Sequence, residues 1–427
     1  MEHIAIKLRC YPNRTQLQAL PQWFGSCRFV FNRALYTRIM DYENWVRLGR
    51  PTDYKWVNFY ALSSLLQTWK EEYPWLQEVS AQTLQQTLKH LDSAFTNWFK
   101  GRAKYPRFRK KSYSGSVHLT NQQLPEYNLE VVGKVLRLKL PKGLGVLKAK
   151  LHRPLPNGRL LKTVISRNSS GEYYASLMYE VEDGYSLRQT PHEIKPRCGV
   201  DLGVVKPLTV AYVSNDSTQK FKVLGIEVKA QLEKVEKRRK RYQKSYARKL
   251  LSKKSRQAKV KPNKKTGEVQ RVSTKNLDKA RLKVAKIYQY EANIRRDFAE
   301  KTSNTLASRF EVIKFEDLKV SSMTKSAKGT LDEPGTNVAA KSGLNRELLR
   351  LGLSQVVSLT QYKARLYGGE VKFVNPQFTS QRCSCCGNIN KENRKSQAVF
   401  KCVECGFKLN ADHNAAINIL TRKTLAA

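Results

Sequence analysis

Two cysteine pairs constrain the fold of this chain more than any other feature of its sequence. Two residues separate Cys383 from Cys386 and Cys402 from Cys405, and fifteen residues separate the pairs. Thiolates bind Zn²⁺ tetrahedrally, and two such pairs supply four ligands that close the coordination shell. The spacing therefore predicts a structural zinc site, with a redox dithiol as the alternative. Cys385 also lies inside the first pair, but only Cys383 and Cys386 have the two-residue spacing.

Three acidic residues stand in separate apolar segments. Asp201 lies in one expected strand, Glu316 ends a later one, and Asp412 begins the last expected helix. Carboxylates are the ligands that Mg²⁺ and Mn²⁺ prefer, and two such ions about 3.5–4 Å apart can drive phosphodiester hydrolysis. We therefore expect these three acids to be catalytic metal ligands.

Structural roles are the alternative for these acids. An acid at a strand end can simply close a turn, and Asp412 can be an N-terminal helix acid that the helix dipole favours. Asp317 competes with Glu316, but it should face the opposite side of the strand, so we prefer Glu316.

The charge of the chain indicates a polyanionic partner. Its 79 Lys and Arg outnumber 35 Asp and Glu, a net charge of +44. Such an excess repels itself unless a polyanion neutralises it, and counterion release makes nucleic acid the natural candidate. An anionic membrane is the alternative, but the sequence has no transmembrane run. Eight cysteines without an evident export signal favour a reducing compartment, the cytoplasm, and metal binding over disulfides.

Two basic segments are the strongest candidates for nucleic-acid contact. Residues 231–286 contain 22 Lys and Arg against 4 Asp and Glu, too one-sided for an ordinary solvated face. Residues 101–111 interleave basic and aromatic side chains, which suits phosphate contact and base stacking. Glutamines near residue 85 could read adenine, although exposed helix polarity also explains them. The candidates are Arg28, Gln82, Gln85, Gln86, Arg102, Lys104, Tyr105, Arg107, Phe108, Arg109 and Lys110.

Apolar periodicity predicts a multidomain α+β chain. Residues 1–12 resemble a strand, and residues 13 to about 100 show helical spacing, with helices expected at 58–70 and 80–100. Alternation then predicts strands at 131–140, 147–152, 161–167 and 173–182. We expect a small antiparallel β-barrel that strand 1–12 completes, which makes the helical region an insertion.

The second half begins after an expected linker at 184–196. Strands are expected at 197–205, 208–213, 221–228, 312–315 and 370–374. A long basic helical stretch should follow the third strand, and a helix is expected at 346–366. This order is that of a ribonuclease H-like α/β domain. Residues 252–274 and 321–345 are polar and look disordered.

The sequence resembles the TnpB family, RNA-guided DNA endonucleases encoded by insertion sequences, and more distantly the type V CRISPR effectors. The matching segments are 8–16, 25–32, 85–89, 105–111, 199–203, 315–318, 379–383 and 414–420. Many family members carry an acidic-basic pair directly before the last acid, where this chain has Asn410 and Ala411. The residues after Gly203, from 204 to 207, also depart slightly from the family pattern.

The resemblance implies an architecture and partners. A wedge β-barrel would comprise 1–12 and 112–190, a helical recognition domain 13–111, and a RuvC nuclease domain 195–427 with a zinc ribbon inserted at 376–411. One protein would bind one transposon-derived guide RNA, recognise a short transposon-adjacent motif and cut target double-stranded DNA. Structural Zn²⁺ and catalytic Mg²⁺ or Mn²⁺ are expected, and residues 321–345 fall where the family has a mobile lid. The expected location is the nucleoid region of the prokaryotic cytoplasm.

Three other functions fit parts of this pattern. A guide-RNA-dependent repressor would bind DNA without cutting it. A conventional transposase would cut and rejoin transposon ends without RNA. A zinc-ribbon nucleic-acid-binding protein would use the acids only structurally.

Overall fold

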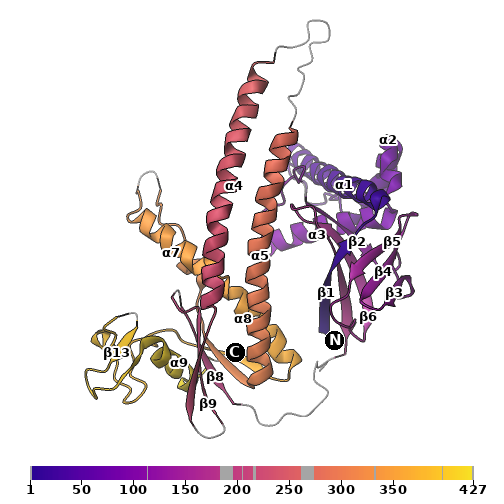
Figure 1. Cartoon of the computed structure of the whole chain (residues 1–427). Helices are drawn as coiled ribbons and strands as arrows, with labels where there is room; N and C mark the ends of the chain where they lie inside the picture. Colours follow the sequence, from indigo (N-terminus) through magenta and orange to yellow (C-terminus); the bar gives the residue numbers. More distant parts are fainter. Residues whose placement is uncertain are drawn as a thin grey trace. The chain divides into compact units, whose positions relative to one another are not determined.

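The computed structural model describes residues 2–112, 114–182, 196–203, 205–214, 218–260, 274–330, 333–396 and 398–425 (Figure 1). The chain divides into two compact units, Met1–Asp183 and Gly184–Ala427. All of the expected linker at 184–196 except Pro196 lies outside the described residues. None of the described helices is both long and apolar enough to cross a membrane.

A seven-stranded antiparallel sheet forms the centre of the N-terminal unit. Its order is β2-β6-β7-β1-β5-β4-β3, so the N-terminal strand joins the later ones as expected and becomes a central strand. The strands are β1 (Glu2–Tyr11), β2 (Gly115–Thr120), β3 (Leu129–Val132), β4 (Val135–Leu140), β5 (Gly145–Lys150), β6 (Arg159–Arg167) and β7 (Tyr173–Val181).

Two expectations for this sheet need correction. It is an open half-barrel and not a closed barrel, because β2 and β3 are its edges and do not pair with each other in the described residues. The α1 and α3 helices pack against β2 instead. The single strand expected at 131–140 is two strands, because Gly133 (φ 57°) opens a two-residue turn between Val132 and Val135.

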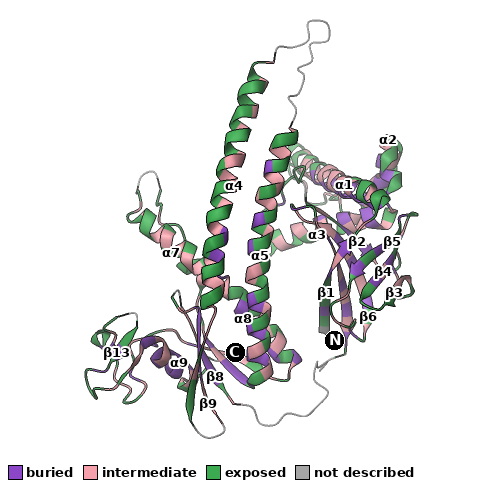
Figure 2. Ribbon diagram, viewed as in Figure 1, coloured by how far each residue is buried: buried purple, intermediate pink, exposed green. Residues whose placement is uncertain are grey.

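The helical insertion lies between β1 and β2. Asn13 and Gln16 form a capping box that starts α1. The expected stripe of α3 is buried, with Leu84, Leu88 and Leu91 fully shielded from solvent (Figure 2). The helices of the insertion are α1 (Arg14–Arg47), α2 (Phe59–Glu72), the short 3₁₀ helix Pro74–Glu78 and α3 (Ala81–Phe99); a second 3₁₀ helix, Glu126–Asn128, lies between β2 and β3.

A five-stranded mixed sheet forms the centre of the C-terminal unit. Its order is β10-β9-β8-β11-β12; β10, β9 and β8 are antiparallel neighbours, whereas β8, β11 and β12 are parallel. Its strands are β8 (Cys198–Leu202), β9 (Leu208–Val213), β10 (Gln219–Leu224), β11 (Val312–Glu316) and β12 (Glu370–Val374). A separate small ribbon pairs β13 (Val399–Lys401) with β14 (Lys408–Asn410).

Helices cover both faces of this sheet. One face carries Val200 and Phe315 into a core shared with α5 and α8, and α9 packs on β8 and β9. The helices are α4 (Ile226–Ala258), α5 (Lys275–Arg309), α6 (Val320–Met323), α7 (Val338–Arg350), α8 (Leu353–Leu366), α9 (Ala411–Thr421) and a 3₁₀ helix at Lys391–Asn393. The α4 and α5 helices lie side by side as a long hairpin (Figure 1).

Glycines with positive φ explain two differences from the expected boundaries. The third strand ends at Leu224 and not at 228, because Gly225 (φ 95°) precedes α4. The helix expected at 346–366 is two helices, separated at Gly352 (φ 64°). Parts of the two polar segments are helical and not irregular. Helix α4 continues to Ala258, although 261–273 lie outside the described residues, and α6 and α7 cover the beginning and the end of 321–345.

Candidate metal sites

Sheet register brings two of the three predicted acids together. Strands β8 and β11 are parallel neighbours, and Phe315 pairs with Val200. The next residue in each strand is the acid, so Asp201 and Glu316 lie near the ends of adjacent strands, at the same level and on the same face. Both are partly buried, whereas the competing Asp317 is exposed and its backbone N–H pairs with Val374.

Helix α9 packs on the face that carries both acids. Gly199 lies two residues before Asp201, on the same face of β8. A Cβ atom at Gly199 would lie 2.3 Å from the carbonyl oxygen of Ala416 and 2.5 Å from the backbone nitrogen of Leu420. Lys314, two residues before Glu316, donates to the carbonyls of Leu420 and Arg422 at 2.8 Å. The C-terminal half of α9 therefore packs closely on β8, where Gly199 has no side chain, and is hydrogen-bonded to β11 through Lys314.

Asp412 is the second residue of this docked helix. Its backbone N–H donates to the side-chain oxygen of the N-cap residue Asn410 at 3.2 Å. Its carboxylate lies 3.6 Å from Lys206 Nζ and 3.9 Å from an Arg394 guanidinium nitrogen. Lys206 also donates to Asn410 at 3.1 Å. The residues that depart from the family pattern, Lys206 and Asn410, therefore contact the third acid directly.

The pKa of Asp201 indicates that the acids act on one another. Burial, together with the carboxylates of Glu316 and Asp412, raises the pKa of Asp201 to about 7, although the charge of Arg394 opposes the shift. Burial also raises the pKa of Glu316, against the hydrogen bond from Thr379 and the charge of Arg422. Such mutual repulsion is relieved by a bound cation.

Oxygen donors of this kind fit a hard divalent cation. Their spacing is wider than that of the cysteines. Among the described residues, only the four cysteines form a group whose ligand atoms all lie within 4.8 Å of one another.

Thr379 is a site residue that sequence reasoning did not single out. It is buried, and its hydroxyl donates a short hydrogen bond to the carboxylate of Glu316. Its only sequence signal was its place in the matching segment 379–383. Such a bond fixes the orientation of a ligand carboxylate.

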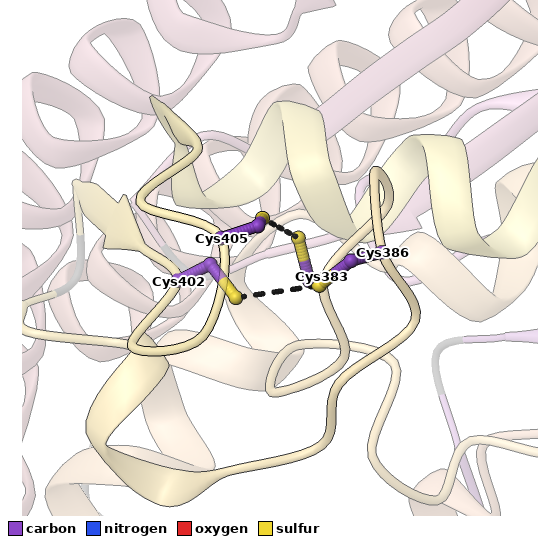
Figure 3. Close-up of side chains that lie close together, drawn as sticks. All are labelled: Cys383, Cys386, Cys402 and Cys405. Atoms are coloured by element: carbon purple, nitrogen blue, oxygen red, sulfur yellow. Dashed lines mark hydrogen bonds between the residues drawn. The ribbon is translucent and has the colours of Figure 1, made fainter.

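The four predicted cysteines form one compact cluster. Their sulfurs face one another across the two turns (Figure 3), with 3.7 Å between Cys383 and Cys405 and 3.6 Å between Cys386 and Cys402. A tetrahedron with Zn–S bonds of about 2.3 Å has edges of roughly 3.8 Å, so the cluster fits Zn²⁺. Exposed Cys385 is not part of it, which settles the register of the first pair.

Hydrogen bonds to Cys402 favour its thiolate, the form that binds metal. Burial opposes ionisation of the Cys402 thiol, but hydrogen bonds from the backbone of Cys405 and Glu404 and from the neighbouring cysteine side chains together lower the pKa of Cys402 to about 7. Cys383 and Cys402 pack with Phe400 against the start of α9, at Ala411. Because thiolates bind zinc, this environment favours the liganded form.

Two asparagines of α9 connect the cluster to the acids. The side-chain oxygen of Asn414 accepts from the backbone of Ser384, and its amide donates to the carbonyl of Arg382. Asn418 donates to the carbonyls of Thr379 and Arg382. One helix therefore holds Asp412, the segment that carries Thr379, and the first cysteine turn.

The predicted nucleic-acid contacts of the N-terminal unit have different surroundings. Arg28, Arg109 and Lys110 come together on the wall of one cavity. Gln82 is hydrogen-bonded to Gln122 and Thr120, and Gln85 and Gln86 are partly buried on α3. Tyr105 packs edge-on against Phe95 and Trp98. The remaining candidates, all exposed, are Arg102, Lys104, Arg107 and Phe108.

Family models match three parts of the chain. Residues 176–327 match a family described as "Probable transposase" of the OrfB IS605 type, and residues 354–419 match a "Cas12f1-like, TNB domain". Residues 1–45 match the helix-turn-helix model of the same insertion-sequence type. The structure instead has a strand and one continuous helix there. The matches define an insertion-sequence protein.

Full-length relatives identify the family. InsQ of Escherichia coli K12, assigned as an RNA-guided DNA endonuclease, is 34% identical over 97% of this chain and 91% of its own length. A protein of Streptomyces pristinaespiralis with the same assignment is 28% identical over 97% of this chain and 88% of its own. A Cas12f1 chain solved with its guide RNA and target DNA has a similar fold, with a TM-score of 0.53 and 14% identity over 99% of both chains. The chain belongs to the TnpB family.

Proposed function

We propose that this protein is an RNA-guided DNA endonuclease that cleaves target DNA by metal-dependent phosphodiester hydrolysis. The observation that supports the proposal is that Asp201 and Glu316 lie on adjacent strands, on the face against which α9, the helix that carries Asp412, is packed. The relative InsQ, similar over nearly the whole chain, is assigned the same activity.

The residues of the site have distinct tasks in this proposal. Asp201, Glu316 and Asp412 would hold Mg²⁺ or Mn²⁺, which supplies Lewis-acid activation of water and neutralises charge on the phosphate. Thr379 orients Glu316, and Lys206 with Arg394 holds Asp412 in place until the cation binds. Cys383, Cys386, Cys402 and Cys405 would hold a structural Zn²⁺, because four thiolates leave no open coordination position.

We assign the domains on the same basis. The strand order β10-β9-β8-β11-β12 supports a ribonuclease H-like RuvC domain over 195–427, with the zinc ribbon at 376–411. The open sheet would be the wedge domain, 1–12 and 112–190, and the helices of 13–111 the recognition domain. Residues 321–345 would form the lid. One protein would carry one transposon-derived guide RNA, read a short adjacent motif and act on double-stranded DNA in the prokaryotic nucleoid.

The test begins with RNA that co-purifies with the protein. Sequencing that RNA and challenging the complex with a randomised DNA library in Mg²⁺ should reveal one adjacent motif and cleavage beside the guide-matched sequence. Removal of the RNA by ribonuclease should abolish cleavage, and added guide RNA should restore it.

The alternatives give different results in this assay. A repressor would retain the matched DNA without cutting it. A conventional transposase would cut equally well after ribonuclease treatment. Either result would overturn the proposal.

A further inference from the structure

A cavity of about 500 Å³ in the N-terminal unit has no part in the nuclease chemistry proposed above. Its walls come from α1, α3, β2, β6 and the basic segment before β2, residues 101–112, which we call the tract. Both α1 and α3 pack against β2, which closes the back of the cavity. Its volume is within the range of sites that bind small ligands.

Several cations line this cavity. Arg28 projects from α1, Arg109 and Lys110 belong to the tract, and Arg167 ends β6. No Asp or Glu is among the lining residues. Within the described part of the chain, Arg28, Arg109 and Lys110 form no ion pair with a carboxylate. Unneutralised cations that converge on one space are a site for a multiply charged anion.

Other arginines of the same unit are neutralised. Arg38 lies 2.6 Å from Asp92, and Arg9 lies 2.8 Å from Glu172. Carboxylates are therefore present in this unit but are placed away from the cavity.

Arg109 is held in position before any ligand arrives. Its guanidinium lies 3.6 Å from the ring centroid of Phe31. Its backbone N–H donates to the side-chain oxygen of Asn32 at 2.7 Å, and the Asn32 amide donates back to the Arg109 carbonyl at 3.0 Å. A guanidinium stacked on an aromatic face keeps its donor edge free for the oxygens of a phosphate.

Two histidines give the cavity a different, uncharged side. The rings of His90 on α3 and His118 on β2 meet edge to face at 4.2 Å. Burial, together with the charges of His90, Lys162 and Arg109, lowers the pKa of His118 to about 4. Neutral imidazoles offer a flat surface with one donor and one acceptor each, which suits a sugar or a base.

Part of the cavity wall is tightly packed. A Cβ atom at Gly115 would lie 2.7 Å from Phe24, and Cys27 is a buried, uncharged thiol beside Thr87. The cavity therefore combines cations, neutral imidazoles and the hydroxyl groups of Ser112, Ser114, Ser116 and Ser166.

We propose that this cavity captures a single nucleotide of a bound nucleic-acid strand, with its phosphate on Arg28, Arg109 and Lys110 and its sugar or base beside His90 and His118. The inference rests on the proposed function for the presence of such a strand, and it adds a site where one position of that strand is fixed. Guide RNA and target DNA both carry this chemistry, so the experiment has an arm for each.

Phosphate ethylation interference tests the proposal on the whole protein. Guide RNA, or either strand of the target DNA, is ethylated sparsely at its phosphates, and strands that enter the protein–RNA complex are separated from those that do not. The wild type should exclude strands ethylated at the captured phosphate. Arg28→Gln and Lys110→Gln should each accept them, and each should weaken binding of the affected strand about tenfold.

The variants and the control distinguish capture of one phosphate in the cavity from a general attraction of positive charge for nucleic acid. Arg28 lies on α1 and Lys110 in the tract, so a folding defect in one, detected by circular dichroism, leaves the other usable. Lys139→Gln removes an equal charge from an exposed position on β4, outside the cavity, and should keep the wild-type interference pattern.

Each further outcome decides a different question. Unchanged interference in both folded variants, or an equal change in Lys139→Gln, overturns the capture site. Displacement of the RNA by AMP with no interference position would assign the cavity to a free nucleotide and overturn it as well. A wild-type protein that binds neither RNA nor DNA overturns the proposed function instead.

Discussion

The four-cysteine cluster and the three-carboxylate site belong to the same unit, but they are assembled differently. The cysteines come from two short turns, and their sulfurs already lie at the spacing of a tetrahedral metal site. The acids come from two strands and a helix that are far apart in the chain, since Glu316 lies 115 positions after Asp201 and Asp412 lies 96 positions after Glu316. The positive side chains of Lys206 and Arg394 lie beside one of these acids, Asp412. A metal bound to the cysteines would add to the stability of the fold, whereas the acids can be brought together only once the fold is complete.

The largest expected effect is on the carboxylate site. Asp201→Ala removes an acid that lies on the α9 face beside Glu316, and it should lower the cleavage rate by roughly 10³-fold or more while RNA binding remains. Single-turnover cleavage of a matched duplex and a filter-binding assay measure both. Asp317→Ala removes an exposed acid next to Glu316 and should change the rate less than twofold. Equal losses in the two variants would contradict our assignment of the site.

Loss of the four-cysteine cluster should disturb the arrangement of the three acids, because α9 contacts both parts of the unit. Cys402→Ser should remove bound zinc, loosen the segment that Asn414 and Asn418 hold, and lower cleavage by on the order of 100-fold. Mass spectrometry under native conditions counts the metal, and the cleavage assay reports the site. Cys385→Ser lies outside the cluster and should keep both zinc and activity. Full activity in a zinc-free Cys402→Ser protein would show that the two sites are independent.

A smaller loss of cleavage activity is expected when only the hydrogen bond that orients Glu316 is removed. Thr379→Val keeps the shape of the side chain but deletes the hydroxyl that donates to Glu316. It should weaken Mg²⁺ or Mn²⁺ activation by about 10–100-fold, seen as a shift in the metal concentration for half-maximal cleavage. Thr379→Ser keeps the hydroxyl and should restore most of the response. Failure of serine to do so would mean that packing, and not the hydrogen bond, is what matters.

The smallest effect concerns stability without metal. The folded pKa of Asp201, about 7, lies above its ordinary value of 3.8, so the folded state binds this proton more tightly than the unfolded state. Ionisation therefore costs stability as pH rises from about 4 to 7, and the cost persists above 7. Asp201→Asn removes that cost. It should stabilise the protein by about 1–2 kcal/mol at pH 8 and by almost nothing at pH 4.

Calorimetry in EDTA at the two pH values measures this difference. If the carboxylates repel one another without a cation, Asp201→Asn should stabilise the protein more at pH 8 than at pH 4. Equal effects of Asp201→Asn at both pH values would mean that Asp201 is not held in a repulsive site.

Much of this architecture follows from local pattern. The stripe of α3 and the alternation of β7 predict their elements because burial on one face sets the spacing of apolar residues. The cysteine cluster follows from spacing alone, because its ligands are local. The order of the C-terminal strands follows from the alternation of strand and helix signals.

What the sequence could not predict depends on contacts between distant segments. Lys206 stood out only as a departure from the family pattern, and nothing in the sequence connects it to Asp412 across 205 intervening positions. His90 and His118 belong to no motif, and only the packing of α3 on β2 brings their rings together. The break between α7 and α8 at Gly352 was missed because the apolar spacing continues across it.

The central place of β1 has a consequence for synthesis on the ribosome. Its neighbours in the sheet, β5 and β7, are translated only after the whole helical insertion. At about 5–20 residues per second, both edges of the nascent strand stay open for on the order of ten seconds or more. During that interval the exposed backbone can pair with another emerging chain, so crowded polysomes are the conditions under which this protein should aggregate most readily.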